Sequence, residues 1–285
     1  MIPQAYITAW RSDAPWADDA QVEQDLVLTR ALAELFSNPE LAGQLALRGG
    51  TALNKLHISP PRRYSEDIDL VQVHAGSIGS VLDGIRNTLD AWLGTPRRTS
   101  SQSGVTLVYR FESEIPPVRP LRLKIEMNTR EHFTVLGHQH LPLVISNPWF
   151  SAESAIRTFD INELMGTKLR ALYQRRKGRD LFDLWLCLEG KLTKPEQVVS
   201  CFLEYMSRSG KPVSRAEFEQ NLHNKKSDPE FLADINPLLA NDVKYRSSVA
   251  FTVVYDQFVS RIPGNPWKGT SDVDDRHNDD RDNID

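Results

Sequence analysis

The sequence predicts an α+β protein, with a sheet in the first half of the chain and helices in the second. Residues 121–128 alternate as in a half-buried strand, with four apolar side chains on one face and Arg122, Lys124, Glu126 and Asn128 on the other. From residue 149 onward, apolar residues recur at helical spacing instead. We therefore predict a sheet-containing core over residues 1–148, a helical domain over residues 149–268, and a disordered acidic tail over residues 269–285.

The core should open with a helix over residues 21–36, whose apolar residues follow helical spacing until Ser37-Asn38-Pro39 ends it. A short apolar segment then leads to Gly49-Gly50, and residues 51–57 have the pattern of a short helix. We expect a second helix over residues 77–93, and strands over residues 67–73, 105–111, 121–128 and 137–145.

The first helix of the second half has a start signal. Asp160 and Glu163 stand three residues apart ahead of an apolar-periodic run, the pattern of a capping box, and predict a helix over residues 160–175. Gly178 interrupts the pattern before a helix over residues 179–188. Further helices are expected over residues 195–207, 214–223, 229–239 and 247–261.

The charge of the chain is unevenly distributed. The 285 residues carry a formal net charge of −4, but residues 271–285 hold seven Asp and two Arg, so the remainder is close to +1. A near-neutral fold neither requires nor excludes a nucleic-acid partner. No apolar stretch approaches a membrane span, the N-terminus has no signal-peptide pattern, and Cys187 and Cys201 have no metal-type spacing. We expect a cytoplasmic protein, without membrane contact, whose cysteines are buried free thiols.

Asp67 and Asp69 are the strongest candidates for chemistry. Their carboxylates project from the same face of a predicted strand, where like charges cost energy unless a cation lies between them. Mg²⁺ suits such a pair, because it takes one or two carboxylates beside substrate phosphates and water. Upstream, Gly49-Gly50-Thr51 offers a tight turn with backbone N–H groups and a hydroxyl for phosphate oxygens. The combination predicts nucleotide chemistry, whereas an isolated Asp-x-Asp would be a solvated strand end.

Two further residues extend this candidate site. Ser65 stands two residues before Asp67, and Glu126 projects from the polar face of a later strand. Transfer of phosphoryl or nucleotidyl groups by two metal ions uses carboxylates from adjacent strands, so we predict Glu126 as a third metal ligand. The alternative is a surface ion pair between Glu126 and Lys124 or Arg122.

Lys168 lies inside the apolar stripe of the helix over residues 160–175, where a structural helix would carry a hydrophobic residue. We predict that Lys168 faces an anion such as a triphosphate; the alternative is a lysine whose amine reaches solvent at the edge of the stripe. Residues 175–179 contain four cations, including Arg176 and Arg179, and predict a polyphosphate or RNA-backbone contact. Asp183 either orients a cation or a nucleophile or pairs with Arg179, while Asp180 fits an ordinary first-turn acid.

Taken in order, five segments within residues 25–190 resemble the AbiEii group of nucleotidyltransferase toxins, which includes the mycobacterial MenT proteins. They are Gly-Gly-Thr-Ala-Leu-x-Lys at 49–55, Arg63-Tyr64-Ser65-Glu66-Asp67-Ile68-Asp69-Leu70, Lys124-Ile125-Glu126, the helix from Glu163 to Lys168, and Arg179-Asp180-Leu181-Phe182-Asp183-Leu184. The resemblance implies a polymerase-β-like nucleotidyltransferase core with a mixed sheet, a mainly helical C-terminal domain, and a toxin of a toxin–antitoxin or phage-defence system. Gly-Gly-Thr departs from the Gly-Ser that is usual in polymerase-like enzymes, although a Thr hydroxyl makes the same hydrogen bonds.

The resemblance also implies roles for individual residues. Gly50 and Thr51 match the turn that accompanies the nucleotide phosphates, and the adjacent Gly49 is expected to bind the nucleotide with them. Asp67 and Asp69 match the metal ligands. Glu126 stands where the family has its third strand acid, and Lys168 and Asp183 match the later Lys and Asp motifs. The expected catalytic residues are therefore Asp67, Asp69, Glu126, Lys168 and Asp183. Lys168, Arg176 and Arg179 would hold phosphates, with hydrogen bonds from Thr51 and Ser65.

The expected activity is Mg²⁺-dependent transfer of a nucleoside monophosphate from an NTP to an RNA 3′ end. The acceptor end of tRNA is the expected target, which would block translation, and a cognate antitoxin is the expected protein partner. One alternative is transfer to a protein or small-molecule hydroxyl. Another is a non-catalytic protein that binds a nucleotide or tRNA, which an intact Asp67-x-Asp69 argues against, because a binder needs no paired metal ligands.

Overall fold

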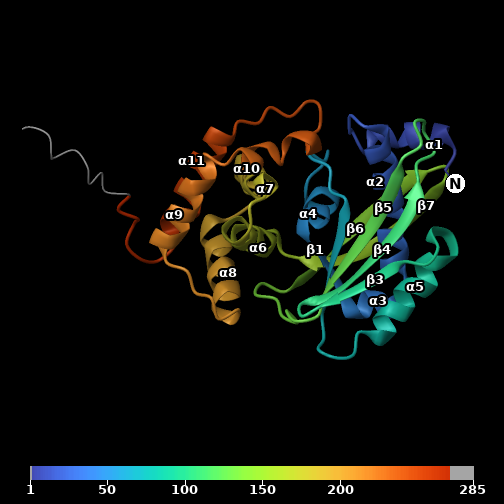
Figure 1. Ribbon diagram of the computed structural model, residues 1–285. Helices are drawn as coiled ribbons and strands as arrows, with labels where there is room; N and C mark the ends of the chain where they lie inside the picture. The colour runs from blue at the N-terminus through green and yellow to red at the C-terminus, as the bar shows by residue number, and fades with distance from the viewer. Residues whose placement is uncertain (1, 270–285) are drawn as a thin grey trace, which may run out of the picture.

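A mixed sheet of seven strands forms the first part of the computed structural model, which describes residues 2–269, and helices form the second part (Figure 1). The strands are β1 (Leu45–Arg48), β2 (Asp67–Gln72), β3 (Arg97–Ser101), β4 (Gly104–Glu112), β5 (Pro120–Asn128), β6 (His138–Asn147) and β7 (Phe150–Phe159). Their order in the sheet is β3-β4-β5-β2-β1-β7-β6. β2 pairs in parallel with β5 and β1 in parallel with β7, while the other neighbours are antiparallel.

Short and long helices surround this sheet in the first 160 residues. They are α1 (Gln4–Ala9), η1 (Trp10–Ser12), α2 (Asp19–Ser37), α3 (Pro39–Gln44), α4 (Gly49–Ala52), the π-helical turn η2 (Leu53–His57) and α5 (Gly79–Leu93). The helices predicted over residues 21–36 and 77–93 are thereby confirmed as α2 and α5, and the four predicted strands as β2, β4, β5 and β6.

The expectation that the chain is helical from residue 149 onward is wrong. Residues 150–159 form β7, which pairs with β6 along its whole length and with β1 at the register Leu47↔Thr158. Tertiary pairing decides this segment, because its inward residues include Ser154 and Thr158, which hide the strand alternation. A division at residue 148 would cut the β6–β7 hairpin, so the helical part begins at α6; the two-domain division itself stays a prediction.

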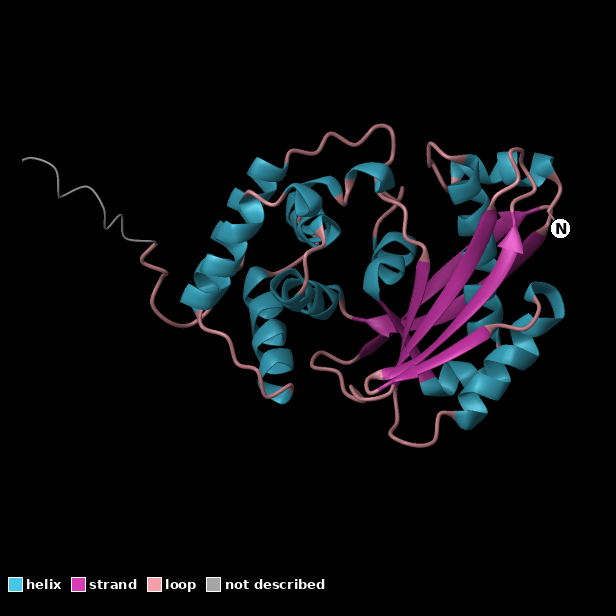
Figure 2. Ribbon diagram, viewed as in Figure 1, coloured by secondary structure: helices cyan, strands magenta, loops and turns pink. Residues whose placement is uncertain are grey.

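The helical part contains six α-helices and two 3₁₀ turns within the described residues (Figure 2). They are α6 (Ile161–Gln174), α7 (Gly178–Glu189), α8 (Pro195–Arg208), α9 (Arg215–Lys226), α10 (Pro229–Ala233), η3 (Asn236–Leu238), α11 (Ser247–Gln257) and η4 (Val259–Arg261). Cys187 and Cys201 are buried free thiols, as predicted. None of the helices in residues 2–269 combines the length and the apolar character that crossing a bilayer requires. The acidic tail, apart from residue 269, lies outside the described residues.

The capping box expected at the start of α6 forms only in half. The Asp160 side chain accepts a hydrogen bond from the backbone N–H of Asn162, as an N-cap should. Glu163 instead turns inward, where it is fully buried and accepts hydrogen bonds from Thr134 Oγ1, from two backbone N–H groups of the β5–β6 loop and from Tyr205 Oη. Glu163 therefore joins the sheet to the helical part.

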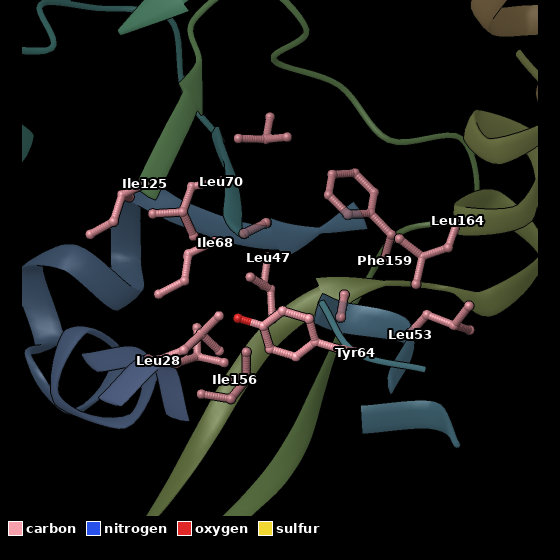
Figure 3. Packing of buried hydrophobic residues seen from close by; sticks show 14 of the residues in the cluster. Leu28, Leu47, Leu53, Tyr64, Ile68, Leu70, Ile125, Ile156, Phe159 and Leu164 are labelled. Atoms are coloured by element: carbon pink, nitrogen blue, oxygen red, sulfur yellow. The ribbon is translucent and has the colours of Figure 1, made fainter. Parts of the chain in front are cut away.

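The two faces of β2, β4 and β5 differ in what covers them. Leu107, Ile125, Ile68 and their neighbours on one face are buried, and they belong to the same hydrophobic cluster as the apolar residues of α2 and α5. Figure 3 shows Leu47, Ile68, Leu70 and Ile125 from three strands within this cluster, together with Leu28 of α2. The other face, on the side of the helical part in Figure 1, remains accessible along β4 and β5. Because side chains alternate, this open face carries Asp67, Asp69 and Glu126.

Candidate active site

Three carboxylates meet on the open face of the sheet, as the sequence predicts. In the parallel pair β2–β5, Asp69 stands opposite Glu126 and Asp67 opposite Lys124. On the other side of β2, Arg48 at the end of β1 stands opposite Asp69. One row of neighbouring strands thus presents Arg48, Asp69 and Glu126, and the next row presents Asp67 and Lys124.

The two aspartates are held in an environment that disfavours their negative charge. Burial raises the pKa of Asp67 to about 6, against the opposing effect of Lys124 and with a further contribution from Asp69. Burial likewise raises the pKa of Asp69, with Arg48 acting in the opposite direction. Asp67 Oδ1 is buried and has no hydrogen-bond partner among residues 2–269. An orphaned carboxylate oxygen beside a second buried carboxylate is a donor set that a cation would complete.

Lys124 forms ion pairs with two of the three carboxylates. Its Nζ contacts Glu126 Oε1 closely and lies 3.5 Å from Asp67 Oδ2. The Glu126–Lys124 ion pair, considered as the alternative to metal binding, is therefore formed. It lies next to Asp67, among the three candidate metal ligands. Within residues 2–269, no three His, Cys, Asp or Glu side chains form a group that could hold a metal ion by themselves.

A cavity of about 170 Å³ opens beside the carboxylates. Its lining includes Arg48, Asp69 and Glu126, and on the β3–β4 side Ser101, Ser103 and Thr106. Carboxylates, an arginine and hydroxyl groups in one concave polar site are suited to a phosphorylated ligand with a bound cation.

The Gly-Gly turn is shaped by the side chains packed against it. Gly49 follows Arg48 at the end of β1 and has a φ of 79°, a conformation that favours glycine. A β-carbon on Gly49 would overlap Asp69 Oδ2, and one on Gly50 would overlap the guanidinium of Arg63. Both glycines thus allow functional side chains to approach the backbone where β1 turns into α4.

Thr51 and Ser65 form a pair beneath this turn. Thr51 is buried, its Oγ1 donates to the backbone carbonyl oxygen of Asp67 at 2.5 Å, and it lies 3.0 Å from Ser65 Oγ. The Thr51 hydroxyl, which the sequence predicts as a phosphate contact, is already engaged in holding the start of β2. A role of either hydroxyl in nucleotide binding stays a prediction.

Lys168 is buried among aspartates rather than facing an open site. Its Nζ lies 3.1 Å from Asp180 Oδ1 and 2.9 Å from Asp183 Oδ2. Asp183 also accepts two hydrogen bonds of 2.6 Å from Arg63, and Asp180 accepts two from Arg175. Burial opposes the charge of Asp180, but Lys168 and Arg175 hold its pKa at about 2. Four of these residues are buried, and the side chain of the fifth, Arg175, is 48% exposed. Together they are called here the buried ion cluster, with the members Arg63, Lys168, Arg175, Asp180 and Asp183.

The buried ion cluster acts electrostatically on Asp69, but its members pair with one another and not with the ligands or partners that the sequence predicts. Lys168 and Arg175 both act to lower the pKa of Asp69. The anion that Lys168 requires is supplied by the protein itself, and Asp183 pairs with Arg63 and Lys168 rather than with Arg179. Asp180, expected to be an ordinary first-turn acid, is fully buried within the cluster. Arg63 stands in a segment of the family resemblance, but its spacing does not predict its burial, because a buried arginine cannot be told from a surface one by spacing.

The cations of residues 175–179 are mostly paired. Arg175 binds Asp180, Lys177 lies 3.3 Å from Asp234, and Arg176 lies 3.7 Å from Asp228 with its side chain 79% exposed. The backbone N–H of Arg179 donates to Asp234. Within the described residues, no ion pair or hydrogen bond joins Arg176 or Arg179 to Asp67, Asp69 or Glu126, and their predicted phosphate contacts stay predictions.

Glu131, which sequence reasoning missed, holds Arg48 in the cavity wall. Its carboxylate accepts hydrogen bonds of 2.6 Å from Arg48 Nη1 and from Arg170 Nη1. Burial alone would raise the pKa of Glu131, but the two arginines outweigh it and hold the pKa at about 2. The three residues come from β1, the β5–β6 loop and α6, so Glu131 positions Arg48 across the junction of sheet and helices.

We expect Glu131→Gln to lower the free energy of unfolding by up to about 3 kcal/mol at pH 7, as follows from a pKa of about 2 against 4.5. The folded-state pKa is depressed, so this stability is present above pH 4.5 and is lost as the pH falls toward 2. Urea denaturation of both proteins at pH 7 and pH 3 measures it, and the difference should shrink by about half at pH 3. A difference that is the same at both pH values would contradict the role assigned to this carboxylate.

Paired strand carboxylates, a glycine turn and a polar cavity on a mixed sheet define the nucleotidyltransferase class of enzymes. The family model of the nucleotidyl transferase AbiEii toxin of type IV toxin–antitoxin systems matches residues 30–253. The chain belongs to this family. It is a nucleotidyltransferase that takes its nucleotide from an NTP and releases pyrophosphate, and it is a toxin with an antitoxin as its counterpart.

A solved structure shares this fold. The chain is similar to MenT4, a nucleotidyltransferase toxin from Mycobacterium tuberculosis H37Rv, with 15% identity and a TM-score of 0.67 over 92% of this chain and 91% of that one. An antigenic nucleotidyltransferase-like protein from Paracoccidioides brasiliensis matches with 16% identity and a TM-score of 0.38 over 74% of this chain and 93% of that one. No curated protein matches the chain.

Proposed function

We propose that this protein transfers a nucleoside monophosphate from an NTP to the 3′ hydroxyl of an RNA, with tRNA as the acceptor, and thereby blocks translation. The observation that carries the proposal is the row of Asp69 and Glu126 beside Asp67, directly against the Gly49-Gly50 turn. We expect the protein to act in the cytoplasm, where NTPs and tRNA are found, and its antitoxin to be a separate protein.

The residues present fit Mg²⁺. Asp67 and Asp69 would hold it with Glu126, and the buried, unpartnered Oδ1 of Asp67 is the atom that most requires a cation. A group of three ready-made ligands is not needed, because Mg²⁺ commonly takes one or two carboxylates and completes its shell with substrate phosphates and water. When bound, Mg²⁺ supplies activation of the attacking hydroxyl and neutralisation of charge on the departing pyrophosphate.

The other side chains position the nucleotide. Arg48, fixed by Glu131, presents a guanidinium to the cavity and can hold a phosphate. Lys124 lies between Asp67 and Glu126, and its ammonium group can turn toward the phosphates of a nucleotide that enters the site. The buried ion cluster contains three cations and two anions, so it has a net charge of +1 near Asp69, and its member Asp183 fixes Arg63 against the turn.

Incubation with each α-labelled NTP, total RNA and Mg²⁺ tests the proposal. We expect label on tRNA, no label when the metal is chelated, and pyrophosphate as the second product. Label on protein or on a small molecule instead would favour those acceptors. No transfer to any acceptor, with NTP still bound, would favour a nucleotide-binding protein without catalysis.

A further inference from the structure

Three arginines stand on the open face of the sheet, on the strands that lie between the carboxylates and the β3 edge. They are Arg97 of β3, Arg110 of β4 and Arg122 of β5, all exposed, and they are called here the arginine face. Arg97 stands opposite Val108 of β4, Val108 opposite Lys124 of β5, and Lys124 opposite Asp67. One row across four strands therefore runs from Arg97 to the first catalytic aspartate.

Strand spacing gives the size of this surface. Neighbouring strands lie about 4.8 Å apart, so the backbone of Arg97 is about 14 Å from that of Asp67. Arg110 and Arg122 stand opposite each other, two residues along the strands from the Val108–Lys124 position. The arginines thus flank the approach to the carboxylates and do not line the cavity that holds Arg48.

Among the described residues, two members of the arginine face have no acidic partner, and the third has one long ion pair. Within residues 2–269, Arg97 and Arg110 form no ion pair and no side-chain hydrogen bond, and the acid nearest to Arg122 is Glu66, 3.9 Å away and also partly exposed. Like charges placed directly opposite on antiparallel strands, as Arg110 and Arg122 are, destabilise a sheet. In contrast, Arg175, Arg176 and Lys177 each have an aspartate partner. A polyanion lying across the sheet would remove the repulsion between Arg110 and Arg122.

We propose that the arginine face binds the phosphates of the last nucleotides of the RNA acceptor strand and directs its 3′ hydroxyl to Asp67 and Asp69. This inference rests on the proposed function. Guanidinium groups bind phosphate oxygens through two parallel hydrogen bonds, and a strand of phosphates can follow the row from the sheet edge inward. A single NTP cannot occupy both ends of the surface if its phosphates lie beside Arg48 and Asp69, so the arginines are assigned to the acceptor.

Binding of fluorescent bulk tRNA, followed by anisotropy over a range of salt concentrations without NTP, tests this surface. The variant is Arg97→Gln with Arg110→Gln. The control is Arg86→Gln with Arg261→Gln, which removes the same charge from α5, on the other face of the sheet, and from η4. Loss of two phosphate contacts should reduce the salt slope by about 1.4 and weaken binding about twentyfold at 0.1 M salt. NTP affinity should stay at the wild-type level, and thermal stability should stay there or rise, because Arg110→Gln removes the repulsion between Arg110 and Arg122.

If the variant binds tRNA with the same affinity and the same salt slope as the control, the arginine face does not bind the RNA. A loss of NTP affinity as large as the loss of tRNA affinity would also overturn the proposal, because the arginines would then belong to the nucleotide pocket. The transfer assay separates this from failure of the proposed function. If wild-type protein labels RNA and the variant does so with an unchanged KM for RNA, only the surface is wrong. If wild-type protein labels no RNA, the acceptor is wrong and the surface with it.

Discussion

Asp69→Asn should lower kcat/KM for nucleotidyl transfer by about a thousandfold, equivalent to about 4 kcal/mol of transition-state stabilisation. The change removes one negative charge from the proposed Mg²⁺ site and keeps the shape that fits against Gly49. Because burial already disfavours the Asp69 carboxylate, the neutral side chain should leave thermal stability unchanged or raise it. Activity is measured with labelled NTP and stability by thermal unfolding.

A second readout does not require turnover. Mg²⁺ bound to the folded state should raise the melting temperature of the wild-type protein, and this increase should be lost in Asp69→Asn. Glu153→Gln is the matched control, because it neutralises an exposed carboxylate on β7 of the same sheet. Activity of Asp69→Asn within about tenfold of wild type, a loss of only about 1.4 kcal/mol, would remove Asp69 from the metal site.

Asp183→Asn should cost about 3–5 kcal/mol of unfolding free energy, the range found when one partner of a buried ion pair is removed. Asp183 is fully buried and neutralises Arg63 and Lys168, both themselves buried. Without the charge of Asp183, the three cations of the buried ion cluster share a single anion, Asp180. Urea denaturation at neutral pH measures the effect.

The neighbouring pair Arg62–Asp242 supplies the control. Its side chains are 36% and 68% exposed, so Asp242→Asn should cost less than about 1 kcal/mol. Adding Lys168→Met to Asp183→Asn removes a cation together with the anion, and the double variant should lose less stability than the two single variants combined. Equal effects of Asp183→Asn and Asp242→Asn would mean that the cluster contributes no more than a surface ion pair.

The buried ion cluster gives the two later motifs of the chain a physical explanation. Lys168 and Asp183 lie on α6 and α7, and through Arg63 they fix the backbone at Gly50, beside the carboxylates. A variant of either residue is therefore expected to change both stability and activity. The Asp69 variant, in contrast, should lower activity without lowering stability, so the two kinds of role can be separated by measuring both quantities.

Part of this site follows from the sequence because its signals are local. Period-two alternation is a property of any extended strand, so Asp67, Asp69 and Glu126 could be assigned to one face without knowledge of the fold. Helical spacing and caps likewise predicted α2, α5 and α6. The α+β class and the resemblance to the AbiEii family, both now shown, rest on such local patterns in chain order.

Other features depend on contacts between distant parts of the chain, and only the tertiary structure decided them. β3 consists of exposed polar residues and β7 has polar residues facing inward, so neither shows the alternation that identified the other strands. Lys168 is marked by the sequence as unusual, but its partners come from the next helix. One of them, Asp183, is shared with Arg63, which lies 120 residues from Asp183 in the chain. Arg48 acquires its role through Glu131, 83 residues away. Spacing reports the direction in which a side chain points, whereas the identity of its partner depends on how the elements pack.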